Sequence, residues 1–254
     1  MRVIKSFFIA FSIYSRIPVP QFDWKEEDMK YMLCFFPWIG GVIGILLFLW
    51  RRFSCHYGAG NVCDTMVGAA IPLLVTGGFH ADGFMDTMDA FHSYQPRERK
   101  LEILKDSHIG AFSVIMLAVY GLVYLGAFSE VREESLFRIF CVGFFLSRCL
   151  SGICVVSLPS AKNEGMLSYF ADSSERNAVK LALCLQALAS AGYMLSQSVG
   201  SGCLALAAAL LTLVYYTYRC RKELGGITGD TAGYFVLFCE MSILVSMAVM
   251  DIIG

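Results

Sequence analysis

The chain has 254 residues, of which 57% are hydrophobic and only 16% charged, and its formal net charge is -1. Because so few polar residues cannot cover a water-soluble globule of this length, the composition predicts a protein whose solvent is the lipid bilayer. The lack of a Lys and Arg excess excludes nucleic acid as the main partner, since phosphate backbones recruit basic chains. The ten cysteines form no CxxC pair and mostly stand in apolar runs, which indicates buried thiols rather than a zinc or iron-sulfur site.

The N-terminal segment, MRVIKSFFIAFSIYSRIPVP, combines a charged start with a short apolar stretch. No small-residue cleavage site follows this stretch before Arg16 and the two prolines, so the segment lacks the form of a signal peptide. We expect it to remain as an interfacial or half-buried helix.

Spanning a bilayer takes about 20 apolar residues, and seven windows of the sequence approach that length with few charges. They are 32–50, 61–79, 109–128, 136–157, 178–199, 201–218 and 232–253. Among the charged residues inside these windows, Arg148 and Glu240 lie deepest. No repeat or linker divides the chain, so we expect one domain over residues 1–254. Its predicted fold is an all-α integral membrane protein with about seven transmembrane helices and an N-terminal interfacial helix.

The distribution of Lys and Arg predicts the orientation in the membrane. With the N-terminus inside and seven crossings, fourteen of these residues fall in inside segments and three in outside loops. The inside segments are 1–31, 80–108, 158–177 and 219–231. The three polar stretches richest in unusual residues therefore all land on the cytoplasmic side, where they can build one site.

The sharpest signal is the segment GGFHADGFMDTMDAFHS, in which Asp82, Asp86 and Asp89 follow each other at spacings of four and three. On a helix this spacing places the three carboxylates on one face, where like charges repel. A hard divalent cation among them, magnesium or manganese, would explain the arrangement. The alternative interpretation is a solvated acidic helix end, favoured by the helix dipole.

Two further polar clusters stand directly before apolar windows. In LEILKDSHIGAF, Lys105 is explained as a topology anchor, whereas Asp106 beside it is not. In KELGGITGDTAGYF, paired glycines precede Thr228 and Asp230. This second cluster fits either a functional loop or a tight turn in which Asp230 caps the following helix.

Several other residues near these clusters are candidates for substrate binding. Basic side chains neutralise phosphoryl oxygens, and a histidine can ligate metal, act as a base, cap a helix or simply pack. The predicted substrate-binding residues are His80, Lys105, Ser107, Arg148, Lys162, Gly226 and Thr228.

These motifs resemble those of the cobalamin synthases, also called adenosylcobinamide-GDP ribazoletransferases. The resemblance is carried, in chain order, by YSRIPVP, FFPWIGGVIG, GGFHADGFMDTMDA, LEILKDSHIGAF and GGITGDTAGYFVLFCE, which together extend over nearly the whole chain. The sequence departs from the family pattern at His108 and Ser113, where Arg and Gly are more usual, and at Lys162, where an Arg is expected.

The resemblance implies an enzyme of the bacterial cytoplasmic membrane that joins adenosylcobinamide-GDP to alpha-ribazole, or to its 5'-phosphate, and releases GMP. It implies magnesium held by Asp82, Asp86 and Asp89, which would neutralise the pyrophosphate and the departing GMP. Asp82, Asp89, Asp106 and Asp230 are the expected catalytic residues. The carboxylate that accepts the hydroxyl proton is either Asp89 or Asp106, and a homo-oligomer is left open.

Two other functions fit parts of the sequence. A CDP-alcohol-type membrane phosphotransferase also carries spaced aspartates and runs the same displacement with CMP leaving. A membrane transporter would use intramembrane charges such as Arg148 and Glu240. Transporters place their site near the bilayer midplane, however, whereas the acidic residues here cluster at one predicted membrane surface.

Overall fold

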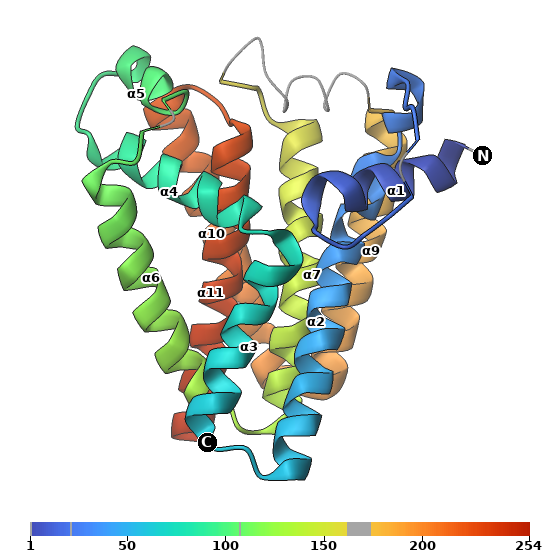
Figure 1. The fold of residues 1–254 in the computed structure, drawn as a ribbon, viewed down its shortest axis with the longest axis vertical. Coiled ribbons are helices and arrows are strands. Elements are labelled where there is room, and N and C mark those ends of the chain that lie inside the picture. Colours follow the sequence, from blue (N-terminus) through green and yellow to red (C-terminus); the bar gives the residue numbers. More distant parts are fainter. Residues whose placement is uncertain (1, 21, 107, 162–173) are drawn as a thin grey trace.

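The computed structural model describes residues 2–20, 22–106, 108–161 and 174–254, and within these ranges the chain is almost entirely helical (Figure 1). The predicted residues Ser107 and Lys162 lie outside the described ranges. The helices are α1 (Arg2–Tyr14), η1 (Glu26–Met29), α2 (Met32–Tyr57), α3 (Asn61–Thr76), α4 (Phe79–His92), α5 (Arg97–Ile103), α6 (Ala111–Glu130), α7 (Glu134–Ser157), α9 (Arg176–Gln197), α10 (Val199–Leu224) and α11 (Gly229–Ile253).

Six of these helices are long and apolar enough to cross a membrane: α2, α6, α7, α9, α10 and α11. The pair α3 and α4 makes a seventh if it is counted as one broken span, with its two members bent by 92° relative to each other. All seven predicted windows coincide with these helices. The prediction of an all-α integral membrane protein with about seven transmembrane helices is therefore confirmed.

The second predicted window ends early. Window 61–79 becomes a helix only as far as Thr76, because Gly77 and Gly78 adopt left-handed φ angles of 64° and 80°. A helix of 16 residues is about 24 Å long, shorter than the roughly 30 Å of the hydrocarbon core. The chain then turns into α4, which lies across the end of the bundle in Figure 1.

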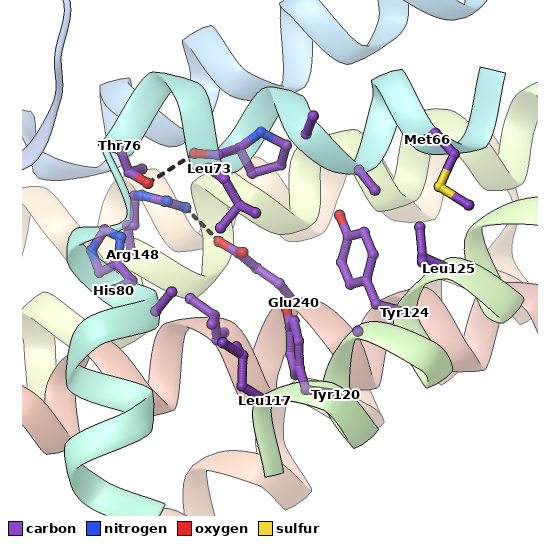
Figure 2. A pocket seen from close by; sticks show the side chains of 16 residues that line it. Met66, Leu73, Thr76, His80, Leu117, Tyr120, Tyr124, Leu125, Arg148 and Glu240 are labelled. Atoms are coloured by element: carbon purple, nitrogen blue, oxygen red, sulfur yellow. Dashed lines mark hydrogen bonds and ion pairs between the residues drawn. The ribbon is translucent and has the colours of Figure 1, made fainter. Parts of the chain in front are cut away.

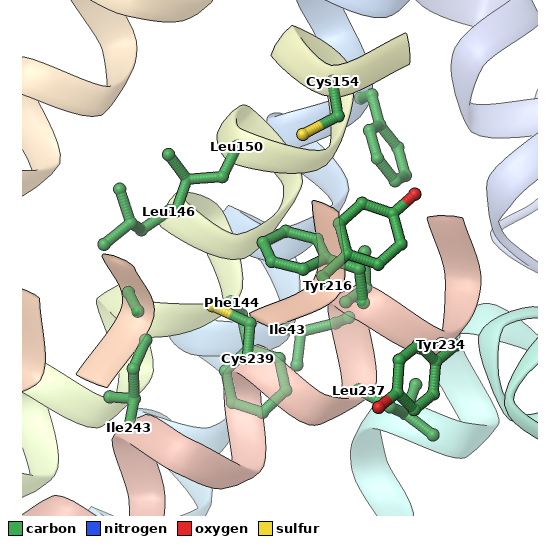
Figure 3. Packing of buried hydrophobic residues seen from close by; sticks show 14 of the residues in the cluster. Ile43, Phe144, Leu146, Leu150, Cys154, Tyr216, Tyr234, Leu237, Cys239 and Ile243 are labelled. Carbon is green, nitrogen blue, oxygen red and sulfur yellow. The ribbon is translucent and has the colours of Figure 1, made fainter. Parts of the chain in front are cut away.

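Helix α7 is the centre of the bundle and packs against α2, α9 and α11. Its contact with α2 is close because Gly40 and Gly44, four residues apart, face the backbone carbonyls of Phe144 and Cys141. Small residues at this spacing let two membrane helices approach each other, since dispersion contacts replace the hydrophobic effect inside lipid. Where α7 meets α10 and α11, the core contains large apolar side chains and buried thiols (Figure 3).

The cysteines follow the predicted pattern in part. Cys141, Cys149, Cys154, Cys220 and Cys239 are buried. Cys203 stands in an apolar run but is exposed, which the apolar-run argument did not predict. A residue in a transmembrane window need not be buried in protein, because lipid covers the outer faces of the helices.

An ion pair connects α7 and α11 inside the bundle. The Arg148 Nη1 atom lies 2.6 Å from Glu240 Oε1, and both side chains are at most 4% exposed. Arg148 also donates to the Phe144 carbonyl oxygen at 2.8 Å, and the Ser147 hydroxyl donates to Glu240 Oε1 at 3.1 Å. Arg148 and Glu240, the two charged residues that the sequence places deepest in the membrane windows, thus neutralise each other.

Helix α1 runs across the bundle axis, as Figure 1 shows, so the predicted N-terminal helix is confirmed, and its position at a membrane interface stays a prediction. The Lys5 ammonium pairs with Asp28 at 3.0 Å, and the Ser6 hydroxyl donates to the Asp28 carbonyl oxygen at 2.6 Å. Beyond the helix, the Arg16 N–H donates to the Val75 carbonyl oxygen at 2.8 Å. The N-terminal segment is therefore attached to the end of α3, next to the turn into α4.

Candidate active site

The functional stretches of the chain meet at one end of the bundle, the end that carries α1, α4 and α5 in Figure 1. The opposite end carries the α2–α3 connection and the C-terminus. This arrangement follows from the odd number of crossings, as the sequence predicts. Which side of a membrane this end faces is treated below as a proposal.

Helix α4 packs on the first turn of α11. A Cβ atom added at Gly83 would lie only 2.7 Å from the Asp230 carbonyl oxygen and 3.0 Å from its Cα. From the other side, a Cβ at Gly233 would lie 3.3 Å from the His80 backbone. Only glycine permits so close an approach, and the approach brings the aspartates of α4 to the loop that carries Asp230.

The three aspartates of α4 share a face, but their surroundings differ. Asp82 is exposed, whereas Asp86 and Asp89 are half-buried. Both oxygens of Asp89 accept backbone N–H groups at the start of α6: Oδ2 from Gly110 at 2.8 Å and Oδ1 from Ser113 at 2.9 Å. Gly110 is the N-cap of α6 and has no side-chain oxygen, so Asp89 performs the capping from another helix.

Sequence reasoning missed this role of Asp89. The feature that could have indicated it is Gly110 at the start of an uncharged span. A glycine N-cap has no side-chain acceptor, so the first N–H groups of the helix must be satisfied by another part of the chain. Each carboxylate oxygen keeps a second lone pair, so the assignment of Asp89 as a metal ligand stays a prediction.

The loop before α11 is joined to the loop after α7 by two backbone hydrogen bonds. The Ile227 N–H donates to the Pro159 carbonyl at 3.0 Å, and the Ala161 N–H donates to the Ile227 carbonyl at 2.8 Å. Gly226 lies against this pairing, where a Cβ atom would come within 2.5 Å of the Pro159 oxygen. Gly226 thus permits the close approach of the two loops, and its predicted role in substrate binding stays a prediction.

The alternative that Asp230 caps α11 is wrong, because Thr228 is the N-cap. Its hydroxyl accepts the Thr231 N–H at 3.2 Å, and the Thr231 hydroxyl accepts the Thr228 N–H at 2.8 Å. Asp230 lies within the first turn and receives a hydrogen bond from the Thr228 hydroxyl at 3.4 Å. The carboxylate of Asp230 is not needed to begin the helix.

The segment after α5 carries Lys105 and Asp106, both exposed. Asp106 Oδ1 accepts the backbone N–H of His108 at 3.0 Å and lies 2.6 Å from the ring Nδ1 of His108. These contacts with His108 lower the pKa of Asp106 below its ordinary value. Asp106 thus stays ionised at neutral pH.

One further basic residue escaped the sequence reasoning. The Arg97 guanidinium lies directly over Gly225, where a Cβ atom would come within 2.5 Å of its Cζ. Helix α5 is held in this place by the buried Lys100, which pairs with Glu223 at the end of α10. Arg97 is the exposed first residue of α5. In the sequence, its position in the basic run RERK before LEILKDS was the one feature that indicated a role near the site.

His80 and Arg148 are not on the aspartate face. They line a cavity of about 400 Å³ on the bundle side of α4, together with residues of α3, α6 and α11 (Figure 2). His80 stands two positions before Asp82, about 200° around the helix, and is only 3% exposed. The structure therefore separates these two predicted substrate-binding residues from Asp82, Asp86 and Asp230.

The donor groups of the site suit a cation that arrives with a phosphate ligand. Within the described ranges, no three His, Cys, Asp or Glu side chains already converge to hold a metal ion. Asp82 and Asp86, one helical turn apart, nevertheless offer hard carboxylate oxygens. Magnesium commonly binds through one or two carboxylates plus substrate phosphates and waters, so a complete protein cage is not required.

The capping role of Asp89 predicts a difference between two neighbouring substitutions. Asp89→Ala should lower the free energy of unfolding by about 1–2 kcal/mol, because it leaves two N–H groups of α6 without their acceptor. Asp82→Ala, which removes an exposed carboxylate, is the matched control and should leave stability unchanged. Thermal unfolding in detergent measures both variants, and equal stability of the two would contradict the capping role.

Comparisons with known proteins identify a family and relatives of this chain. The profile of the cobalamin-5-phosphate synthase family matches residues 6–248. A Lachnoclostridium phytofermentans protein named adenosylcobinamide-GDP ribazoletransferase is 39% identical over 241 residues, which cover 95% of this chain and 92% of its own. Proteins of the same name from Clostridium perfringens and a Geobacillus species are each 29% identical, and the aligned parts cover 94% and 91% of this chain and 95% and 90% of theirs.

No solved structure matches the chain significantly. The match to the family profile extends over nearly the full length and includes every motif assembled at the α4 end. It confirms the resemblance seen in the sequence. The chain therefore belongs to the cobalamin-5-phosphate synthase family.

Proposed function

We propose that this chain is a membrane enzyme that transfers the adenosylcobinamide phosphate moiety of adenosylcobinamide-GDP to alpha-ribazole or its 5'-phosphate. The products are adenosylcobalamin or its 5'-phosphate, and GMP. Family membership and the printed names of the relatives support the reaction class. The observation that carries the proposal is the contact of Gly83 with Asp230, which brings the aspartate face of α4 to the first turn of α11.

Binding of the pyrophosphate would use the positive groups around this contact. The N-terminus of α11 presents backbone N–H groups and the positive end of the helix dipole beside the glycine loop. Arg97, lying over Gly225, and the exposed Lys105 would add cationic side chains that neutralise phosphoryl oxygens. Ser107 and Lys162 remain predicted contributors from the parts of the chain that the structure does not describe.

The reaction itself is one displacement at phosphorus. A ribose hydroxyl oxygen of the acceptor, one that stays free when the acceptor is the 5'-phosphate, forms a bond to the phosphorus on the cobinamide side of the pyrophosphate, and the bond from that phosphorus to the GMP oxygen breaks. Magnesium, with manganese as a substitute, supplies charge neutralisation for the pyrophosphate and the leaving GMP when it is bound. Asp82 and Asp86 would hold it, with Asp89 as a further predicted ligand.

The hydroxyl proton must pass to a base. Of the two predicted candidates, Asp106 suits this role better than Asp89. Both oxygens of Asp89 already accept backbone N–H groups, whereas in the described part of the chain the two hydrogen bonds between Asp106 and His108 both use Oδ1. Asp230, which does not cap α11, would position the phosphate or a metal-bound water.

The reaction assay also tests the rival functions. Purified protein in detergent, given adenosylcobinamide-GDP, alpha-ribazole and magnesium, should form GMP and a cobamide in equal amounts. A transporter would form no GMP without a sealed vesicle. A CDP-alcohol-type enzyme would prefer a CDP-activated donor in direct competition.

Asp82→Asn and Asp86→Asn should each lower GMP formation at least about a hundredfold, because each removes a charge at the reacting centre. Raising the magnesium concentration should recover part of the loss. Asp23→Asn is the matched control, since Asp23 is an exposed aspartate outside the motifs. Wild-type turnover and magnesium dependence in the Asp86→Asn enzyme would refute the metal assignment.

Asp230→Ser should also lower activity at least about a hundredfold, while the melting temperature stays near that of the wild type. The reason is that Thr228 continues to cap α11 in this variant. Thr228→Ala is the complementary variant and should lower the melting temperature by removing the cap. A fully active Asp230→Ser enzyme would show that the loop is structural.

The proposed location is the bacterial cytoplasmic membrane, with the N-terminus and the α4 end in the cytoplasm. The excess of Lys and Arg in the segments at this end supports the orientation. The far end of the bundle offers natural reporters, because Cys55 and Cys63, on either side of the α2–α3 connection, are exposed.

An impermeant maleimide added to intact cells should therefore label wild-type protein at Cys55 and Cys63. In a variant with Cys55, Cys63 and Cys203 replaced by Ser, Gln95→Cys should be labelled only after the membrane is opened, because Gln95 is exposed at the α4 end. Labelling of that cysteine in intact cells would reverse the orientation.

A further inference from the structure

Helix α5 is too short to hold its own position. It has only seven residues, Arg97–Ile103, and isolated helices below about 12–15 residues are marginal in water. It lies at the end of the bundle that carries α4, outside the transmembrane helices, and packs against α4 and α10 (Figure 1). Contacts with these two helices must therefore set its place.

The deepest of these contacts is charged. Lys100 is the one buried residue of α5, at 6% exposure, and its ammonium pairs with Oε2 of Glu223 in the last turn of α10. The other oxygen of Glu223, Oε1, lies 3.7 Å from Nε of Arg219, one turn earlier in α10. The Arg219 guanidinium in turn lies 4.9 Å from the ring centre of Phe91, near the end of α4. Glu223 is thus the carboxylate that connects the ends of α5, α10 and α4.

A charged anchor sets the register of α5 more strictly than an apolar anchor would. Apolar side chains can pack in several neighbouring positions, whereas a buried ammonium is stable only where it meets its carboxylate. Desolvation offsets much of the attraction within such a pair, so its contribution to overall stability is small. Its main effect is to allow a single placement of the helix.

The residue that this placement orients is Arg97. It stands three positions before Lys100, so both side chains lie on the same side of α5. A Cβ atom at Gly225 would come within 2.5 Å of Cζ and 2.6 Å of Nη1 of Arg97. Gly225, with a φ of 75°, begins the loop that leads to Asp230. A shift of α5 by one residue would turn Arg97 about 100° around the helix axis and away from this loop.

We propose that Glu223 is a positioning residue for the transfer reaction. Through Lys100 it holds α5 so that the Arg97 guanidinium stays over Gly225, where it binds the pyrophosphate of the donor. This inference rests on the proposed function, which assigns phosphate binding to Arg97. The alternative is that the pair only fastens α5 to the negative end of the α10 dipole, and donor binding would then not depend on it.

Kinetics with each substrate in turn separate these two roles. Arg97→Ala should raise the KM for adenosylcobinamide-GDP about tenfold, because it removes one charged hydrogen-bond donor. Glu223→Gln and Lys100→Met, which break the pair from either side, should raise this KM to a similar degree and leave the KM for alpha-ribazole unchanged. An enzyme that is only less stable would have fewer active molecules, which lowers the apparent kcat without changing one KM.

Helix α5 also offers a matched control. Arg99 and Glu102 form an ion pair at 2.6 Å within the helix, and both side chains are more than 60% exposed. Glu102→Gln therefore removes a carboxylate from the same helix without removing its anchor. Its KM for both substrates should equal that of the wild type.

A double variant tests whether Glu223 acts through Arg97. In Arg97→Ala/Glu223→Gln, no guanidinium remains to be positioned, so the KM for the donor should equal that of Arg97→Ala alone. Two independent contributions would instead multiply to about a hundredfold.

Trypsin reports the placement of α5 without any need for activity. Arg97 and Arg99 are exposed but lie in a helix, and proteases cut where the backbone opens locally. In detergent, Glu223→Gln should be cut faster than the wild type between residues 97 and 100, whereas Glu102→Gln should not.

Three results would overturn the positioning role in an enzyme whose wild type is active. They are an unchanged donor KM in Glu223→Gln, effects of Arg97→Ala and Glu223→Gln that multiply, and unchanged trypsin cleavage in Glu223→Gln. Wild-type protein that releases no GMP would refute the proposed function, and this role with it, so the two failures can be told apart.

Discussion

The bend between α3 and α4 is the constraint on which the arrangement of the polar end depends. Two successive glycines with left-handed φ angles end a helix that is too short to cross the bilayer fully, and they turn the chain by 92°. Side chains other than glycine are strained in this conformation, so the turn is tied to the sequence Gly77–Gly78. As a result, the aspartates lie on a helix across the end of the bundle rather than inside the membrane.

Helix α4, which lies across the end of the bundle, is held by its contacts with α11 and α6. At its start, Gly83 fits against the backbone of Asp230 in α11. At its end, Asp89 bonds to the first N–H groups of α6. One acidic residue therefore holds the helix in place, and its neighbours Asp82 and Asp86 stay the predicted metal ligands.

The transmembrane helices could be predicted from the sequence because lipid demands long apolar windows whatever the tertiary fold. The shared face of Asp82 and Asp86 was predictable too, since it depends only on helical spacing. The capping role of Asp89 could not be predicted, because it depends on N–H groups at the start of another helix, α6. In the same way, sequence placed Arg148 and Glu240 deep in the membrane but gave no means of knowing that they pair with each other. Thr228, and not Asp230, caps α11, and this choice depends on backbone geometry that a motif does not encode.

The pairing of Ile227 with Pro159 and of Gly83 with Asp230 also has a consequence for biosynthesis. Both contacts use residues of the last loop and the last helix, which the ribosome makes after all the other helices. The six earlier crossings can enter the membrane in turn, and α4 can already contact α6, yet its contact with Asp230 forms only after α11 has been inserted. The polar end is thus completed only once α11 has been made, and a nascent chain held before residue 230 carries its acidic motif without the α11 backbone on which Gly83 packs.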